Sequence, residues 1–303
     1  AADQLGIYEE EVLVASTGVI GEPLPIDKVH DAVPHLVNSL KADGLPNLAE
    51  AIMTTDTVPK YVTARKRIKG GHYHMAAVAK GAGMIRPDMA TMLCFVISDI
   101  ELNPDAMQRL LQSSTDISFN RITVDGDMST NDTILFMANG ASGVSVESSQ
   151  DLEGVQDTLD DLLSQLARLC VKDGEGATKL VEVRVKGAVT DQAARIIADT
   201  VANSNLVKTA LFGEDAYWGR IIAAAGGAGS PVDPHLIDIY FDSVKLVKDG
   251  VGMGKKVEGE ASEILKKPEL AMTLDLKLGN GFSSVLTCDF SLDYVRINAD
   301  YRS

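Results

Sequence analysis

Hydrophobic positions along this chain recur with two different periods, and each period predicts one kind of element. From Asp151 to Val171, leucine and valine return at steps of three and four residues with acidic side chains between them, which predicts an amphipathic helix. Strict alternation in VEVRVK, residues 181–186, within the segment Lys179–Lys186, predicts a half-buried strand. The apolar run Thr91–Ser98 predicts a buried strand.

Further elements follow from capping, turn and composition signals. Helices are predicted over Ile26–Leu40, Asn103–Leu111 and Thr190–Asn203. Strands are predicted over Glu11–Ser16, Phe119–Val124, Ile134–Ala138, Ile237–Phe241, Val244–Val247, Leu270–Leu278 and Ser284–Phe290, the last two joined as a hairpin at Gly279-Asn280-Gly281. Early interleaving of helices and strands, with a strand-rich end, predicts an α+β fold in layers.

Charge and composition argue against some classes of partner and indicate a compartment. The net charge of −15 argues against nucleic acid and anionic membrane as partners, because both are negatively charged. No apolar run is long enough to span a membrane, and the N-terminus shows no signal-peptide pattern. Three cysteines without paired spacing predict reduced thiols, with Cys94 and Cys288 buried, and a cytoplasmic location.

Three motifs resemble ligand-binding motifs, but none of them has the residues and spacing that such a site requires. Asp125–Thr133 lacks the glycine and glutamate of a calcium loop and is predicted to be a turn whose side chains bond backbone groups. GVGMGKK, Gly250–Lys256, lacks the first glycine and the final Ser or Thr of a phosphate loop and is predicted to be a hairpin turn. His72 and His74 have no third ligand in sequence, so no metal site is predicted.

Thr91 stands where the loose segment KGAGMIRPDMA meets the apolar strand. If the bond before a threonine is cut, the new α-amino group lies beside the threonine hydroxyl. That amine titrates near ~7.7–8 and can act as a general base at neutral pH. The alternative is that Thr91 is simply the first residue of a strand. Thr17-Gly18, predicted to lie in a turn, offers a hydroxyl and a backbone N–H for a developing oxyanion.

Seven segments carry a recognisable set of motifs: STGVIGE, MTTDTVPK, KGAGMIRPDMATML, STNDT, DGEGATK, FGEDAYWGRI and NADYRS. Together, and in this order from about Val12 to Ser303, they resemble the ornithine acetyltransferase (glutamate N-acetyltransferase) family of arginine biosynthesis. The resemblance implies a layered α/β sandwich of the self-cleaving type with an N-terminal threonine nucleophile. It implies cleavage at Ala90-Thr91, giving chains 1–90 and 91–303, the second with a smaller subdomain from about residue 175.

The resemblance also assigns roles to individual residues. Thr91 is the nucleophile, and Thr17 and Gly18 form the oxyanion hole. The positions that match substrate-binding residues of the family are Thr54, Lys80, Thr91, Glu175, Asn298 and Ser303. By the same resemblance, about 90 residues that normally precede the segment matching Glu11 are lacking here.

The activity implied is transfer of the acetyl group from N-acetylornithine to glutamate through an acetyl-threonine ester. No metal or redox cofactor is expected, and use of acetyl-CoA as a second acetyl donor is left open. The two chains are expected to associate as a heterotetramer, α2β2 or larger. Two alternatives are left open as well: an aminopeptidase or amidase on the same scaffold, and an inactive metabolite-binding remnant.

Overall fold

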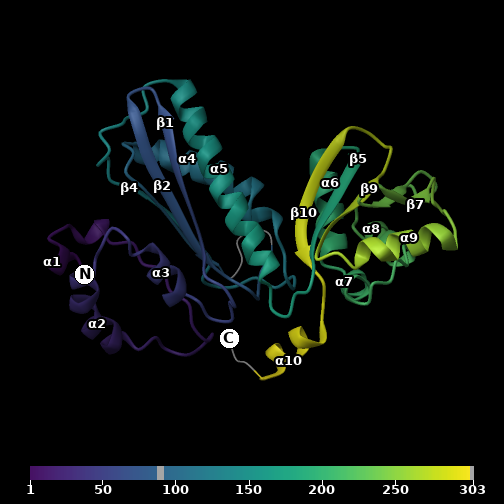
Figure 1. The fold of residues 1–303 in the computed structure, drawn as a ribbon, viewed down its shortest axis with the longest axis horizontal. Helices are drawn as coiled ribbons and strands as arrows, with labels where there is room; N and C mark the ends of the chain where they lie inside the picture. Colours follow the sequence, from purple (N-terminus) through teal and green to yellow (C-terminus); the bar gives the residue numbers. More distant parts are fainter. Residues whose placement is uncertain (87–91, 301–303) are drawn as a thin grey trace.

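In the computed structural model, residues 1–86 and 92–300 are described, and their strands form two separate sheets (Figure 1). The first has the order β1-β2-β3-β4: Lys60–Ile68, Gly71–Lys80, Leu93–Ser98 and Thr133–Ala138. The second has the order β10-β5-β9-β6-β7-β8: Gly281–Cys288, Leu180–Ala188, Glu269–Asp275, Asp238–Phe241, Val244–Lys248 and Val251–Gly252.

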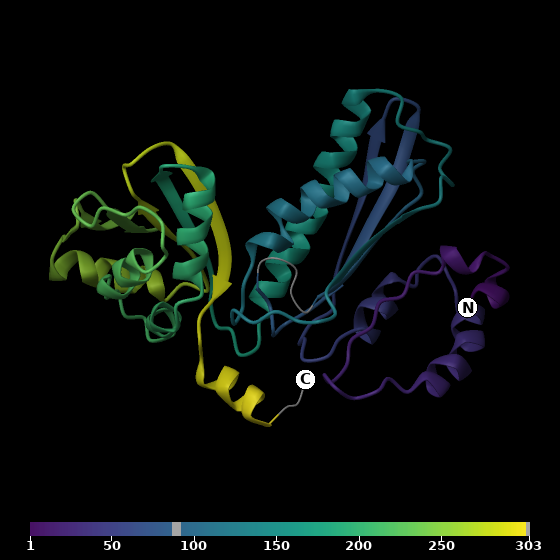
Figure 2. The same ribbon diagram turned by 180° about the vertical axis from the view of Figure 1, so that it is seen from behind.

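Helices are distributed over both sheets and the two ends of the chain. Figure 2 shows α4 and α5 on one face of the first sheet, the N-terminal helices beside that sheet, and α10 apart from both sheets. The helices are α1 Ala2–Leu5, α2 Ile26–Asn38, α3 Leu45–Ala51, α4 Pro104–Ile117, α5 Ser149–Lys172, α6 Asp191–Ala202, α7 Asn205–Phe212, α8 Gly219–Gly226, α9 Lys255–Leu265 and α10 Leu292–Asp300. Within the described residues, no helix combines the length and the apolarity that crossing a membrane requires.

The first hydrophobic core lies between α5 and the first sheet. The leucine face of α5 is fully covered, with Leu159, Leu163 and Leu166 each 0% exposed. Burying one leucine side chain stabilises a fold by about 1.5–3 kcal/mol, so this face holds α5 firmly on the sheet. Ser148 caps the helix by accepting a hydrogen bond from the Asp151 N–H at 3.1 Å.

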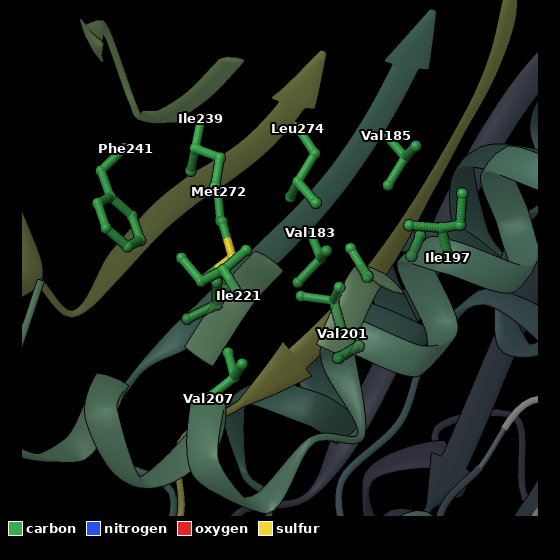
Figure 3. Close-up of a cluster of buried hydrophobic side chains, with 14 of the residues drawn as sticks. Val183, Val185, Ile197, Val201, Val207, Ile221, Ile239, Phe241, Met272 and Leu274 are labelled. Carbon is green, nitrogen blue, oxygen red and sulfur yellow. The ribbon is translucent and has the colours of Figure 1, made fainter. Parts of the chain in front are cut away.

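The second core lies under the six-stranded sheet. Figure 3 shows Val183 and Val185 of β5 and Leu274 of β9 directed toward Ile197 and its neighbours on α6. The alternation read in VEVRVK is therefore real, since its valines are buried. The two cores make separate layered units, which confirms the α+β prediction.

Most predicted elements are confirmed, including α4 with Asn103 as its N-cap and Pro104 in the first turn. The side chain of Asn103 accepts a hydrogen bond from the Ala106 N–H at 2.8 Å. Cys94 and Cys288 are buried free thiols, as predicted. The loop after Val124 is held as predicted, with Asp125 accepting the Asp127 N–H at 3.2 Å.

Three predictions about strands were wrong, because the predicted segments do not pair with other strands as expected. Residues 12–16 form no strand: Val14 is 84% exposed, and no described segment pairs with it, so strand propensity alone is not enough. Phe119–Arg121 is a 3-10 helix continuing from α4, and Ile122 makes only an isolated bridge with Leu286.

The predicted hairpin between Leu270–Leu278 and Ser284–Phe290 is also wrong. Strands β9 and β10 both pair with β5, which lies between them, β9 in parallel and β10 in antiparallel. The connection instead crosses close to the end of β5. A Cβ atom at Gly279 would lie 2.6 Å from the carbonyl oxygen of Ala188, and one at Gly281 2.3 Å from the backbone of Thr190. Glycine is therefore required by this close crossing rather than by a hairpin turn.

Candidate active site

Two of the motifs, KGAGMIRPDMATML and STNDT, meet at one end of the first sheet. Strand β2 is antiparallel to β3, and β3 is parallel to β4, so the last residue of β2 lies beside the first residues of the other two. The register places Lys80, Leu93 and Thr133 in one row. This brings the end of β2, the start of β3 and the end of STNDT, where β4 begins, to the same place.

A cavity of about 430 Å³ opens at this end of the sheet. Six of the sequence-predicted site residues line it, from five separate stretches of the chain. They are Thr17, Gly18, Thr54, Lys80, Glu175 and Asn298. The predicted cleavage site, Ala90 and Thr91, and the predicted substrate residue Ser303 lie outside the described residues.

Lys80 presents a cation to this cavity. The residue is 3% exposed, and its side chain makes no hydrogen bond or ion pair among the described residues. Burial lowers its pKa, while the nearby charge of Asp56 acts in the opposite direction. A buried ammonium without a direct partner is well suited to bind an anionic group of a ligand.

Behind the cavity, an ion network joins the MTTDTVPK segment to two other motifs. The Lys60 Nζ atom lies 2.6 Å from Asp56 and 2.5 Å from Asp173, and its side chain is 0% exposed. Asp56 also accepts the Gly81 N–H at 2.8 Å, directly after Lys80. The network lowers the pKa of Asp56 against the effect of burial. It fixes the positions of Lys80 and of the turn after α5.

Glu175 reaches the cavity because glycines surround it. A Cβ atom at Gly83 would lie 2.4 Å from the carboxyl carbon of Glu175, so only glycine leaves room for that carboxylate. The Glu175 N–H donates to the Ala82 carbonyl oxygen at 2.7 Å. Gly176 has a φ of +66° and lies tightly against the backbone at Tyr294. The KGAGM and DGEG motifs are therefore two halves of one close contact.

The structure also places residues in the cavity wall that the sequence analysis did not single out as site residues. Asp125 accepts the N–H groups of Met84 and Ile85 at 2.6 and 3.0 Å, and burial raises its pKa. The hydroxyl of Tyr294 donates to Asp125 at 3.4 Å, and burial raises the pKa of that phenol. The further lining residues missed from sequence are Val19, Ile20, Thr55, Ala82, Gly83, Met84, Asp127, Met128, Ser129 and Asn131. The indication in the sequence that these residues belong to the site was that they lie within the quoted motifs.

Charges in the cavity wall are unevenly divided. One ammonium, Lys80, faces three carboxylates, Asp125, Asp127 and Glu175. A ligand that carries both a carboxylate and an amino group would find complementary charge on each side. Among residues 1–86 and 92–300, no cluster of three or more His, Cys, Asp and Glu side chains has the arrangement of a metal site.

Comparisons with known proteins match this chain over almost its whole length, and all of them point to the same family. The model of the ArgJ family matches residues 1–303. The chain is 52% identical over 305 residues to the arginine biosynthesis bifunctional protein ArgJ of Geobacter sulfurreducens, covering 100% of this chain and 77% of that protein. It is 44% identical over 310 residues to the glutamate N-acetyltransferase of Methanocaldococcus jannaschii, covering 99% of this chain and 77% of that one.

A solved relative has the same fold. The crystal structure of the arginine biosynthesis bifunctional protein ArgJ from Bacillus halodurans superposes with a TM-score of 0.64 at 40% sequence identity. The match covers 67% of this chain and 96% of the solved chain.

Proposed function

The chain belongs to the ArgJ family, and we propose that it transfers the acetyl group of N-acetylornithine to glutamate through an acetyl ester on Thr91. Relatives at 44–52% identity across the chain make it an acetyltransferase of arginine biosynthesis. One observation carries the proposed site: six residues assigned from sequence motifs line a single cavity at the end of the sheet where β3 begins.

The chemistry needs no external base. The hydroxyl of Thr91 attacks the acetyl carbonyl, and its own α-amine takes the hydroxyl proton. Thr17 and Gly18 stabilise the negative charge on the carbonyl oxygen as the tetrahedral intermediate forms. Ornithine then leaves with that proton on its nitrogen. The amine of glutamate attacks the ester carbonyl, the bond between the acetyl carbon and the Thr91 oxygen breaks, and the proton lost by the glutamate nitrogen restores the Thr91 hydroxyl, giving N-acetylglutamate.

Charge complementarity supports this choice of substrates. N-acetylornithine carries one carboxylate and one side-chain ammonium. Lys80 binds the carboxylate, and Glu175, held by Asn298, binds an ammonium or assists proton transfer. Thr54 adds a neutral hydrogen bond, and Ser303 is assigned the same task.

The active form contains two chains, 1–90 and 91–303, made by cleavage at Ala90-Thr91, with a smaller subdomain from about residue 175. The solved relative's chain corresponds to about two thirds of this chain, which is the share that a product starting at residue 91 would have. The two chains associate as an α2β2 or larger assembly in the cytoplasm. Acetyl-CoA serves as a second acetyl donor, in keeping with the word "bifunctional" in the relatives' names.

Intact mass spectrometry tests the proposal directly. Wild-type protein is expected to show two chains, the larger starting at Thr91, and that chain gains one acetyl group after brief incubation with N-acetylornithine. Thr91→Ala is expected to stay uncut and unacetylated, while Thr200→Ala, on α6, is expected to behave like wild type. An acetyl group that forms in Thr91→Ala would show that another residue is the nucleophile.

The acceptor is tested separately. Ornithine release is measured with and without glutamate, and glutamate is expected to raise the steady-state rate. Release at an equal rate in water alone would mean that the protein is an amidase rather than a transferase.

A further inference from the structure

The cavity of the candidate site has a carboxylate, Asp127, to which no role has been assigned. Asp127 lines the cavity and is an exposed residue. Its side chain makes no hydrogen bond or ion pair among the described residues. Glu175, in the same wall, differs because it already accepts a hydrogen bond from Asn298 at 2.8 Å. Asp127 therefore has both of its oxygens available to a ligand.

Asp125, the third carboxylate of this wall, holds the loop that carries Asp127. Its Oδ1 atom accepts the Ile85 and Asp127 N–H groups at 3.0 and 3.2 Å. Its Oδ2 atom accepts the Met84 N–H at 2.6 Å and a hydrogen bond from the Tyr294 hydroxyl at 3.4 Å. Both oxygens of Asp125 are thus engaged within the protein, which fixes the backbone from which the Asp127 side chain extends.

The phenol of Tyr294 lies where the negative charges of the wall meet. Burial raises its pKa, and the charges of Asp125, Glu175 and Asp127 raise it further. Its ring stacks on Phe290, with the two centroids 4.6 Å apart, so the hydroxyl is held in a defined position. We call Asp125, Asp127 and Tyr294 the anionic corner of the cavity.

The rest of the cavity wall points to a ligand that carries two opposite charges. Lys80 is 3% exposed, and its ammonium has no hydrogen bond or ion pair in the described part of the chain. Val19, Ile20 and Met128 line the same cavity and are 39%, 61% and 57% exposed. A ligand with a carboxylate, a short aliphatic chain and a terminal ammonium would pair both kinds of charge and cover apolar surface.

We propose that the anionic corner is the subsite for the side-chain ammonium of the acetyl donor, and that Asp127 is the group that binds it. This inference rests on the proposed function and assigns the part of the donor that this wall selects. The ammonium of N-acetylornithine stands three methylene groups from the α-carbon. Glutamate ends in a carboxylate instead, so the corner favours the donor over the acceptor. Glu175 is then left for proton transfer or for the α-ammonium of the product ornithine.

The test compares N-acetylornithine with N-acetylnorvaline, which lacks only the side-chain amino group. In Asp127→Asn, kcat/KM for N-acetylornithine is expected to fall roughly fivefold to tenfold through KM, because a neutral amide replaces the carboxylate. The value for N-acetylnorvaline is expected to stay within about twofold of wild type, and the KM for glutamate should not rise. Asp105→Asn, on the exposed surface of α4, is the matched control and should change neither donor.

A second variant moves the charge instead of removing it. Asp127→Glu carries the carboxylate one methylene group further into the cavity. It is expected to keep the preference for an ammonium over N-acetylnorvaline. Its optimal donor is expected to change from N-acetylornithine to N-acetyl-2,4-diaminobutyrate, whose ammonium stands one methylene group nearer to the α-carbon.

Other outcomes decide against the proposal. Equal losses with both donors in Asp127→Asn, or no loss with either, overturn it. Lower resistance to urea together with equal losses would make Asp127 only structural. Failure of the proposed function shows separately, as wild-type protein that gains no acetyl group on Thr91. Calorimetry with ornithine and norvaline then still tests the subsite, since equal affinities of the wild-type protein for the two would contradict it.

Discussion

The side-chain nitrogen of Asn298 donates a hydrogen bond to Glu175 at 2.8 Å, joining two residues 123 positions apart in the chain. This contact ties α10 to the turn that follows α5, and both residues line the cavity. Together with the hydrogen bond from Tyr294 to Asp125, it brings α10 into the candidate site.

Loss of this contact is expected to weaken substrate binding. A hydrogen bond to a charged group contributes about 1.5–3 kcal/mol, so Asn298→Ala should raise the KM for N-acetylornithine by about tenfold or more. Arg296→Ala, which removes an exposed ion pair on the same helix, should change KM less than about twofold. Equal effects of the two variants would place Asn298 outside the site.

Gly83 is expected to tolerate no side chain. Gly83→Ala puts a methyl group where the Glu175 carboxylate now lies, 2.4 Å from its carboxyl carbon, so the carboxylate must move. We expect kcat/KM to fall roughly 100-fold or more, because a displacement of about 1 Å can cost that much. Gly259→Ala, in α9 with no atom within 4 Å of the added carbon, should retain full activity and gain a little stability. A fully active Gly83→Ala enzyme would mean that Glu175 need not be where the structure places it.

Thr17→Ala tests the assigned oxyanion hole. Removing one donor to a tetrahedral oxyanion usually slows turnover by about 10²–10³-fold, and a loss of this size is expected in kcat. Ser16→Ala, one residue earlier, is expected to remain within about twofold of wild type. An unchanged kcat in Thr17→Ala would remove this residue from the reaction.

Lys60 is expected to matter for stability. Lys60→Met leaves Asp56 and Asp173 without the cation between them, and removing one partner of a buried ion pair costs about 3–5 kcal/mol. The exposed pair Lys41–Asp43 provides the control, since Lys41→Met should change the free energy of unfolding by less than about 1 kcal/mol. Urea unfolding followed by circular dichroism measures both.

The same network predicts an acid dependence. The pKa of Asp56 is lowered in the folded protein, so its contribution to stability is present above the unfolded pKa of about 3.9 and is lost as pH falls through the folded value. In Lys60→Met, burial without the ammonium favours the protonated acid. The gap in unfolding free energy between wild type and Lys60→Met is therefore expected to be widest near neutral pH and to narrow below about pH 4. A gap that is constant from pH 7 to pH 3.5 would contradict this account of Asp56.

The sequence determined the elements whose signals are local. The leucine spacing of α5, the alternation of β5 and the Asn103-Pro104 start of α4 need no distant partner, and all three are as predicted. Six of the motif residues assigned from the sequence line one cavity, and the roles assigned to them stay predictions. Residue types and short spacings are written directly in the chain, which is why the three elements could be predicted.

Tertiary structure alone decided which segments meet. Strand β5 lies between β9 and β10, so a strong turn signal at Gly279-Asn280-Gly281 did not make a hairpin. Residues 12–16 resemble a strand but have no partner among the described residues. Asp125 and Tyr294 reach the cavity wall through contacts with residues far along the chain. Pairing, close approach and burial depend on the three-dimensional path of the backbone, and no local pattern records them.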